Sequence, residues 1–384
     1  MNTSPLIALC AGEASGDLLG AHLIEAIRAR CPQARFTGIG GPRMQAAGLK
    51  SLFDQETLAV RGYVEVLKNL PSIWRIRKGL IAEMKRQRPN VFVGIDAPDF
   101  NLGVAAAIKA AGIPTLHYVS PSVWAWRRER VHKIVRQADE VLCLFPMEPE
   151  LYRQAGGRAR FVGHPLAQTL PLEADRAAAR RELGLPETQP VFALLPGSRV
   201  SEIDYMAPLF LQAAQLVRQQ IPEARFLLPY ATEATRTRLQ SLLAAEPYCR
   251  LPLQLLPGGT AQACTAADAV LVTSGTATLE VALCKRPMVI SYKISPLTYA
   301  LVKHKIKVPH VGLPNVLLGR AAVPELLQHD AEPEKLAAAL LDWYRSPEKT
   351  AALQQDFTEL HHLLRKDTAA EAAAAVLAAA GANP

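Results

Sequence analysis

Short runs of β-type composition alternate with helical stretches along most of this chain of 384 residues. Strands separated by helices predict parallel, doubly wound sheets whose faces the helices cover. A charged segment after residue 171 divides the runs into two series. We therefore expect an α/β protein with two Rossmann-like domains that face each other across a cleft. The first series is 6–11, 35–40, 91–95, 115–119, 140–145 and 160–163, and the second is 191–195, 225–229, 252–256, 269–273 and 288–291.

The composition is that of a folded protein with room for two domains. Apolar residues make up 49% and charged residues 20% of the chain, which excludes wholesale disorder. The stretch 334–380 is helical in composition and rich in alanine. We predict a first domain over 1–170, a second over 171–345, and a helical C-terminal tail over 346–384 that packs back on the first domain or on a second subunit.

The cysteines and the apolar runs indicate in which cellular compartment the protein is expected. The six cysteines form no C-x-x-C pair and no metal-ligand spacing, which predicts free thiols in a reducing compartment. The apolar run 6–11 has no Lys or Arg before it and meets Gly-Glu at once, which is typical of a first strand rather than a signal peptide. No run approaches the roughly 20 apolar residues that a spanning helix needs, so we expect a protein that does not cross a bilayer.

Positive charge is concentrated in one apolar segment. The net charge is +8, and the segment 61–88 has eight basic residues against two acidic ones. Basic residues mixed with large apolar ones are typical of segments that bind an anionic lipid surface. The alternative is a core helix with a solvated basic face. The apolar residues that we assign to the membrane are Val64, Val66, Leu67, Leu70 and Trp74.

The segment 269–283 has the pattern of a buried strand, a turn of small residues and a helix. Ser274, Gly275 and Thr276 let the backbone approach a ligand, and the helix directs its unpaired N–H groups and positive dipole end at phosphate. Glu280 lies four residues after Thr276, on the same helix face, where a carboxylate can accept hydrogen bonds from ribose hydroxyls. The pattern predicts a nucleoside diphosphate site, and an ordinary turn followed by a solvated glutamate is the alternative.

A second candidate phosphate loop follows the run 191–195. Gly197 permits close approach, Ser198 can donate a hydrogen bond, and the Arg199 guanidinium fits two phosphate oxygens. Such an arginine, together with two helix ends, can neutralise a departing diphosphate. An arginine in an ordinary surface loop is the alternative. We predict no catalytic metal and no cofactor.

The first loop of the chain does not have the dinucleotide pattern. Gly12, Gly16 and Gly20 are spaced G-x3-G-x3-G, whereas a nicotinamide site has G-x-G-x-x-G. We expect Ser15 or Asp17 to cap the helix that follows. Glu13, in the same loop, has no such structural explanation.

Asp96 ends the apolar run 91–95. A carboxylate at the carboxyl end of a central strand points toward the expected cleft and can remove a proton from an attacking hydroxyl. We expect Asp99, with Asn101, to cap the next helix instead. The D-x-x-D spacing differs from the D-x-D of divalent-metal sites. The residues leave Asp96 and Glu13 as competing candidates for the general base.

Five motifs occur in one order along the chain. They are Gly-Glu-Ala-Ser-Gly-Asp at 12–17, Val-Gly-Ile-Asp-Ala-Pro-Asp-Phe at 93–100, His-Tyr-Val-Ser-Pro-Ser-Val-Trp-Ala-Trp-Arg at 117–127, Leu-Pro-Gly-Ser-Arg at 195–199 and Leu-Pro-Asn at 313–315. Together they resemble the bacterial lipid-A-disaccharide synthase family, and the resemblance extends from about residue 6 to about residue 375.

The resemblance implies an inverting glycosyltransferase of the GT-B fold, in glycosyltransferase family 19. Its donor would be UDP-2,3-diacylglucosamine and its acceptor 2,3-diacylglucosamine 1-phosphate. The products would be the β-1,6-linked lipid A disaccharide 1-phosphate and UDP. Such enzymes are cytoplasmic and bind peripherally to the inner face of the inner membrane, and some are homodimers that exchange C-terminal segments. We expect no nucleic-acid partner.

The resemblance also implies residue roles. Asp96 corresponds to a leading candidate for the general base, Arg199 to an arginine needed for activity, and Glu280 to a glutamate that contacts the nucleotide. Asn315 lies in a loop that we assign to the donor site. Trp124, Trp126 and Arg127 are assigned to the acceptor or the membrane, with local packing of the two tryptophans as the alternative.

Other interpretations of the residues stay open. His117 and His164 are alternative bases, although a lone histidine after an apolar strand is more often structural. A related UDP-sugar enzyme with a soluble acceptor, or a UDP-N-acetylhexosamine 2-epimerase, would use the same fold. A protein that senses a UDP-sugar without turnover is the alternative from another class.

Overall fold

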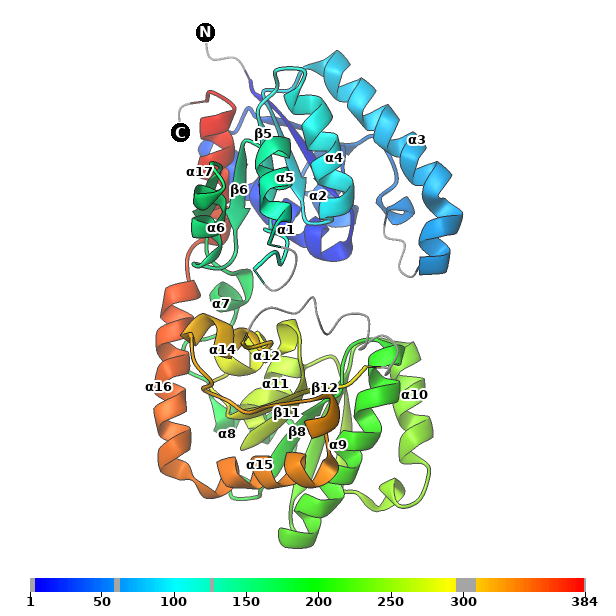
Figure 1. The fold of residues 1–384 in the computed structure, drawn as a ribbon, viewed down its shortest axis with the longest axis vertical. Coiled ribbons are helices and arrows are strands. Elements are labelled where there is room, and N and C mark those ends of the chain that lie inside the picture. Colours follow the sequence, from blue (N-terminus) through cyan, green and yellow to red (C-terminus); the bar gives the residue numbers. More distant parts are fainter. Residues whose placement is uncertain (1–3, 59–62, 125–127, 295–308, 383–384) are drawn as a thin grey trace. The chain divides into compact units, whose positions relative to one another are not determined.

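The computed structural model describes residues 4–58, 63–124, 128–294 and 309–382, with only the backbone for 63–69. The chain divides into two compact units (Figure 1). Unit 1 comprises Met1–Gln168 and Leu364–Pro384, and unit 2 comprises Thr169–Leu363.

Unit 1 contains a seven-stranded parallel sheet with the strand order β3-β2-β1-β4-β5-β6-β7. Its strands are β1 (Leu6–Ala11), β2 (Arg35–Ile39), β3 (Leu49–Ser51), β4 (Val91–Ile95), β5 (Thr115–Tyr118), β6 (Glu140–Cys143) and β7 (Arg158–Phe161). Its helices are α1 (Ala14–Arg30), α2 (Pro42–Ala46), α3 (Tyr63–Gln87), α4 (Pro98–Lys109), α5 (Arg130–Gln137), α6 (Glu148–Gln154), α7 (Pro165–Thr169, ending at the boundary) and α17 (Thr368–Ala379), with a short 3-10 turn at Gln55–Thr57.

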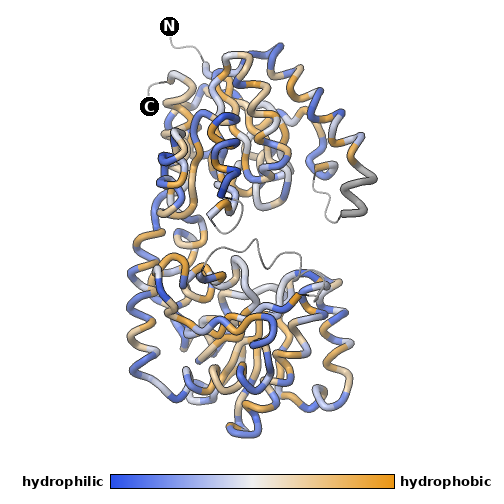
Figure 2. Tube along the Cα trace, viewed as in Figure 1, coloured by the Kyte–Doolittle hydropathy of each residue, from blue (hydrophilic) through white to orange (hydrophobic). Residues whose placement is uncertain are grey.

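The central strands of unit 1 are buried on both faces because alternate residues enter two different cores. In β1, Ile7 and Leu9 pack with α1 and α17, whereas Ala8 and Cys10 pack with α3 and α4. Figure 2 shows the apolar interior in orange. This double burial explains why such strands are continuous apolar runs in the sequence.

Unit 2 contains a six-stranded parallel sheet with the order β10-β9-β8-β11-β12-β13. Its strands are β8 (Val191–Leu195), β9 (Arg225–Tyr230), β10 (Leu253–Pro257), β11 (Ala269–Thr273), β12 (Met288–Tyr292) and β13 (Glu325–Leu327). Its helices are α8 (Arg176–Glu182), α9 (Val200–Gln220), α10 (Glu233–Leu243), α11 (Thr260–Ala266), α12 (Thr276–Leu283), α14 (Leu313–Leu318), α15 (Pro333–Arg345) and α16 (Pro347–Leu364), with 3-10 turns at Tyr248–Arg250 and Gln328–Asp330. One large core joins the sheet to α9 and α15.

The C-terminal segment is divided between the two units. Helix α16 groups with unit 2 up to Leu363, and α17 belongs to unit 1, where it packs against α1. The buried face of α17 consists mainly of alanines with Val376 and Leu377. Short side chains let the two helices approach closely, which accounts for the alanine-rich composition.

The predicted strands are present with ends within two residues of those expected, and the two parallel-sheet domains are confirmed. Strands β3 and β13 were not predicted. Each has three residues at a sheet edge, and neither forms an apolar run. In the part of the chain that the structure describes, no helix is both long and apolar enough to span a bilayer.

Candidate functional site

A cavity of about 590 Å³ lies at the carboxyl ends of the unit 2 strands. This is the edge where open α/β sheets bind ligands. Seven residues singled out from the sequence line it, namely Gly197, Ser198, Arg199, Ser274, Gly275, Thr276 and Glu280. The structure therefore brings the two candidate phosphate loops, which are about 80 residues apart in the chain, to one cavity.

The first loop, between β8 and α9, is held by Glu202. Its carboxylate accepts hydrogen bonds from the backbone N–H groups of Ser198 (2.9 Å) and Arg199 (3.3 Å). Gly197 has φ +122°, and a Cβ there would lie 2.6 Å from the Glu202 side chain, so only glycine fits. The Arg199 side chain is 72% exposed and pairs with Glu202 Oε1 through Nη1 at 2.8 Å. Among the described residues its other guanidinium donors have no acceptor, and they are therefore available to a ligand.

The second loop, between β11 and α12, is also shaped by a glycine. Gly275 precedes α12 with φ +156° and ψ −164°, a combination that is nearly restricted to glycine. Ser274 Oγ donates to the Val311 carbonyl at 3.2 Å, which ties the loop to the segment before α14. The first turn of α12 therefore presents its backbone to the cavity without an intervening side chain at Gly275.

Glu280 lines the cavity from α12. Burial raises the pKa of its carboxyl, and a hydrogen bond with the Ala261 backbone opposes the shift. Hydroxyl donors of a ligand would stabilise the ionised form of this half-buried carboxylate, because their hydrogen bonds replace those to the water that burial removed.

Asn315 does not line this cavity. It is fully buried, and its amide donates to the Val323 carbonyl and to Glu325 Oε1, both at 2.8 Å. Glu325 in turn accepts hydrogen bonds from the backbone N–H groups of Val311 and Gly312, each at 2.9 Å. Ser274 of the second loop is bonded to Val311, Val311 to Glu325, and Glu325 to Asn315. Asn315 therefore supports the second loop indirectly.

The cavity has further lining residues that were not predicted from the sequence, among them two tyrosines and a threonine. Tyr230 and Tyr292 end β9 and β12, and Thr273 ends β11. The Thr273 hydroxyl is buried and has no hydrogen-bond partner among the described residues. Their positions at strand ends were the available signal, but the expected strands 225–229 and 288–291 stopped one residue short of each tyrosine.

In unit 1, Asp96 lies directly after β4 in a left-handed conformation, with φ +53°. Its neighbour Ala97 is also left-handed and precedes α4. The pKa of the Asp96 carboxyl is raised, chiefly by burial. A hydrogen bond with the Ala97 backbone lowers this pKa, the negative charge of Glu13 raises it, and a hydrogen bond from Ser15 lowers it. Ser15 Oγ lies 3.4 Å from Asp96 Oδ2. The two candidate bases are thus electrostatically coupled within one unit.

The turn that carries Asp96 is held by Asn101. Its Nδ2 donates to the carbonyls of Asp96 (2.9 Å), Ile95 (3.1 Å) and Cys10 (3.1 Å). Asn101 does not cap α4 as expected, and Asp99 pairs with Arg130 at 2.8 Å. Asn101 therefore links the ends of β1 and β4 and supports the strained turn.

The other expected cap also differs. Asp17 accepts hydrogen bonds from the backbone N–H groups of Arg43 and Met44, both at 3.0 Å, so it caps α2 rather than its own helix. The residue that precedes α1 is Glu13, without a side-chain cap. Asp17 and Ser15 do not cap α1 because their side chains are used elsewhere.

The two histidines lie in the interior. His117 is fully buried in β5, and His164 is buried and accepts a hydrogen bond from the Leu166 N–H at 3.2 Å. Burial lowers the pKa of each imidazole to about 4. Both positions fit a structural role better than proton transfer to a substrate.

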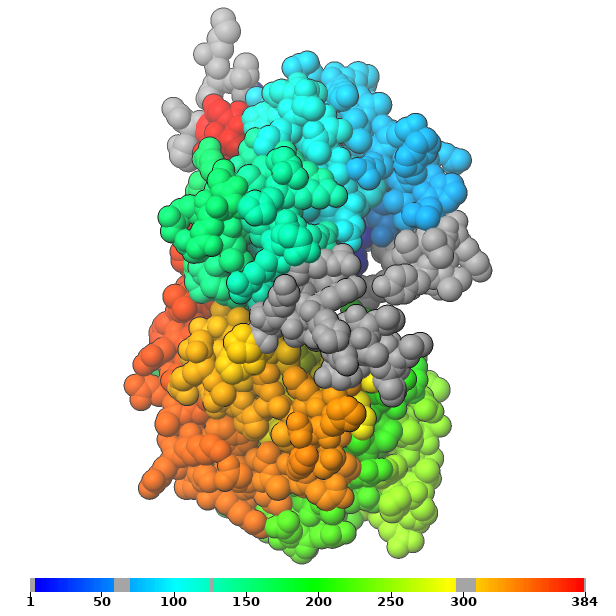
Figure 3. All heavy atoms as spheres, in the orientation of Figure 1, coloured from blue at the N-terminus to red at the C-terminus, as the bar shows by residue number. Residues whose placement is uncertain are grey.

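The apolar residues assigned to the membrane fall on α3, which lies on the surface of unit 1 (Figure 3). Leu70 is 47% exposed and Trp74 58% exposed, and Lys78 Nζ lies 3.5 Å from the Trp74 ring centroid. The side chains of Val64, Val66 and Leu67 lie outside the described ones. The C-terminal half of the helix is anchored in the core by Leu80 and Met84.

Trp124 is half-buried, and its indole N–H has no partner among the described residues. Trp126 and Arg127 lie outside the described residues. Near Trp124, Ser120 Oγ and the Tyr152 hydroxyl lie 2.9 Å apart, and Val119 has φ +79°, which is rare for a β-branched residue. This segment adjoins the end of β5, next to the strand that leads to Asp96.

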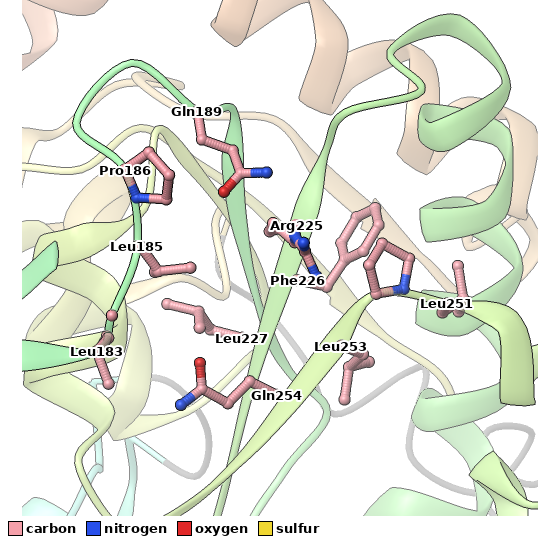
Figure 4. A pocket seen from close by; sticks show the side chains of 12 residues that line it. Leu183, Leu185, Pro186, Gln189, Arg225, Phe226, Leu227, Leu251, Leu253 and Gln254 are labelled. Atoms are coloured by element: carbon pink, nitrogen blue, oxygen red, sulfur yellow. The ribbon is translucent and has the colours of Figure 1, made fainter.

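A different cavity of unit 2, of about 530 Å³, lies at the opposite ends of the strands (Figure 4). It is lined by Leu183, Leu185 and Pro186 from the segment before β8 and by residues that begin β9 and β10. Amino-terminal edges of parallel sheets seldom bind substrates. The cavity at the carboxyl ends is therefore the better candidate.

Comparison with known proteins decides the family. Residues 7–378 match the family described as lipid-A-disaccharide synthetase. The chain belongs to this family. A lipid-A-disaccharide synthase from Neisseria meningitidis serogroup A is 70% identical over 378 residues, which cover 98% of this chain and 98% of that protein. The family resemblance found in the motifs is thereby confirmed.

Solved structures agree on the fold. HepE from Anabaena in complex with UDP and glucose has a TM-score of 0.54 at 17% identity, covering 98% of this chain and 100% of that one. A UGT transferase from Siraitia grosvenorii in complex with UDP has a TM-score of 0.64 at 11% identity, covering 97% and 99%. This member of the lipid-A-disaccharide synthase family thus has the GT-B fold.

Proposed function

We propose that this protein is a lipid-A-disaccharide synthase. It transfers diacylglucosamine from UDP-2,3-diacylglucosamine to the 6-hydroxyl of 2,3-diacylglucosamine 1-phosphate, which gives the β-1,6-linked disaccharide 1-phosphate and UDP. The observation that carries the proposal is the whole-length relationship, at 70% identity, to a protein of that name. The cavity in unit 2 supports it, because two glycine loops and an exposed arginine suit a nucleoside diphosphate.

The donor is assigned to unit 2. The backbone at Ser274, Gly275 and Thr276 faces the diphosphate at the start of α12, and Arg199 supplies the opposite charge. Glu280 accepts the ribose hydroxyls. As the bond between the anomeric carbon and the phosphate oxygen breaks, negative charge grows on UDP, and a preorganised guanidinium stabilises that charge more in the transition state than in the ground state.

The base is assigned to unit 1. Asp96 takes the proton of the acceptor hydroxyl as that oxygen attacks the anomeric carbon from the face opposite UDP, which inverts the configuration. Its raised pKa makes it a stronger base than a solvated aspartate. Asn101 and the left-handed turn hold the carboxylate in place.

Contact with an anionic membrane is part of the proposal, and α3 is the contact surface. We expect Leu70→Ser with Trp74→Ser to weaken binding to vesicles that contain phosphatidylglycerol by about tenfold or more, because both side chains lose apolar burial in the interface. Flotation of the protein with the vesicles at low and high salt measures this binding. Leu363→Ser is the matched control, since Leu363 is 51% exposed on α16 of unit 2. Equal effects of the two changes, or no flotation of the wild-type protein, contradict the assignment.

Homodimer formation by exchange of C-terminal segments stays a prediction. Exchange would transfer α17 from the α1 of its own chain to that of a second copy. Light scattering of the purified protein measures the mass directly.

The test of the function is to incubate the purified protein with UDP-diacylglucosamine, with and without diacylglucosamine 1-phosphate, and to follow products by mass spectrometry. We expect disaccharide and UDP to form together and only with acceptor. Free UDP or an epimerised sugar without disaccharide would instead identify another UDP-sugar enzyme.

A further inference from the structure

A small cavity of about 130 Å³ in unit 1 lies where α3, α4 and α5 converge. At about 30 Å³ for each water, it has room for about four water molecules, which suits one small anionic group. Three cations line it, namely Arg77 from α3 and Arg130 and Lys133 from α5.

A glycine of the neighbouring helix leaves room for the Arg77 side chain. Its guanidinium lies over Gly103 of α4, where a Cβ would approach Nη2 to 1.9 Å. Any larger residue at Gly103 would displace the guanidinium. Leu80 and Met84 follow Arg77 on α3 and are fully buried, so this part of the helix is fixed on the unit.

The charges in the cavity are not balanced. Among the described residues that line it, Asp99 is the only one with a carboxylate, and it pairs with Arg130 at 2.8 Å. Within the described residues, Arg77 and Lys133 have no acidic partner and no acceptor. Two uncompensated positive charges match a phosphomonoester, which carries about −1.5 to −2 near neutral pH. An arginine and a lysine together also supply the forked and single donors that phosphate oxygens accept.

The cavity adjoins the proposed base. Pro98 and Asp99 line it, and consecutive Cα atoms are about 3.8 Å apart, so the Cα atoms of Asp96 and Pro98 are at most about 7.6 Å apart. The cavity is therefore formed in part by residues that follow the proposed base closely in the chain. The geometry points to a phosphate subsite that holds the phosphomonoester of the acceptor while its hydroxyl reaches Asp96. This inference rests on the proposed function for the identity of the acceptor.

Steady-state kinetics in neutral detergent micelles tests it with two acceptors, diacylglucosamine 1-phosphate and the uncharged methyl glycoside of the same sugar. We expect Arg77→Gln and Lys133→Gln each to raise the KM for the phosphorylated acceptor about tenfold or more, because each removes a charged hydrogen bond. The KM for the donor stays unchanged, and with the methyl glycoside the variants equal the wild type. Arg77→Lys, which keeps the charge, restores part of the affinity.

Arg75→Gln and Arg136→Gln are the matched controls, because both residues are exposed on the same helices and do not line the cavity. If Arg77→Gln or Lys133→Gln raises the KM equally for both acceptors, the inference is overturned in favour of a packing role. An unchanged KM with weaker flotation on phosphatidylglycerol vesicles assigns the cations to lipid headgroups instead.

Binding measured without turnover separates this inference from the proposed function. Isothermal titration with glucosamine 1-phosphate and with glucosamine reads the subsite directly. Weaker binding of glucosamine 1-phosphate to Arg77→Gln than to Arg75→Gln supports the subsite even if the wild-type protein forms no disaccharide, an outcome that would reject only the proposed function. Identical binding to both variants overturns the subsite.

Discussion

Replacing Asp96 by asparagine lowers kcat by about 10²–10⁴-fold, the contribution typical of a positioned general base. The change suits this position because asparagine, unlike most residues, readily adopts the left-handed conformation found at φ +53°. The turn and its hydrogen bonds to Asn101 are therefore retained. Steady-state kinetics and UDP binding are measured together, and UDP affinity stays near that of the wild type because Asp96 belongs to unit 1.

One further variant completes this experiment. Ser15→Ala removes only the hydrogen bond of 3.4 Å and changes kcat by less than about tenfold, since a neutral hydrogen bond contributes about 1 kcal/mol. A parallel loss of UDP affinity and kcat in Asp96→Asn would instead place Asp96 in nucleotide binding or in folding.

The pH dependence distinguishes Asp96 from Glu13. A carboxylate acts as a base only when ionised, so kcat/KM falls as the pH decreases through its pKa. Burial holds the Asp96 pKa above the usual 3.8, and the Glu13 charge contributes in the same direction. Glu13→Gln removes that charge, lowers the Asp96 pKa and shifts the acid limb to lower pH with activity retained. A loss of activity in Glu13→Gln as large as in Asp96→Asn identifies Glu13 as the base.

Replacing Arg199 by alanine lowers kcat by roughly 10²–10³-fold, the range seen when one preorganised donor to a developing charge is removed. The loop keeps its shape, because Glu202 still accepts the backbone N–H groups of residues 198 and 199. The measurement is kcat and donor KM at saturating acceptor.

Arg238→Ala is the control for the loss of a surface charge. Arg238 pairs with Asp204 at 2.5 Å on the same unit and does not line the cavity. Exposed ion pairs contribute about 0–1 kcal/mol, so its kcat changes by less than about fivefold. If Arg199→Ala retains a rate within about threefold of the wild type, Arg199 does not face the diphosphate.

Much of the site was predictable because it lies where strands end. Asp96, Arg199 and Glu280 each follow a buried apolar run, and parallel strands place all such ends at one edge of their sheet. The roles of Asn315 and Asp17 were not predictable. Asn315 bonds to Val323 and to Glu325 of β13, and Asp17 bonds to the start of α2, so their partners depend on how separate elements pack together.

The sequence by itself determined the family, the two α/β domains and the loops that line the cavity at the carboxyl ends of the unit 2 strands. These follow from local patterns, because burial periodicity and turn chemistry are encoded within about 20 residues. Only the tertiary structure decided that β3 and β13 complete the sheets, that α17 returns to unit 1, and that Arg77 lies over Gly103 beside Lys133. Each of these depends on contacts between segments far apart in the chain, whose side chains fit together only after the helices have packed.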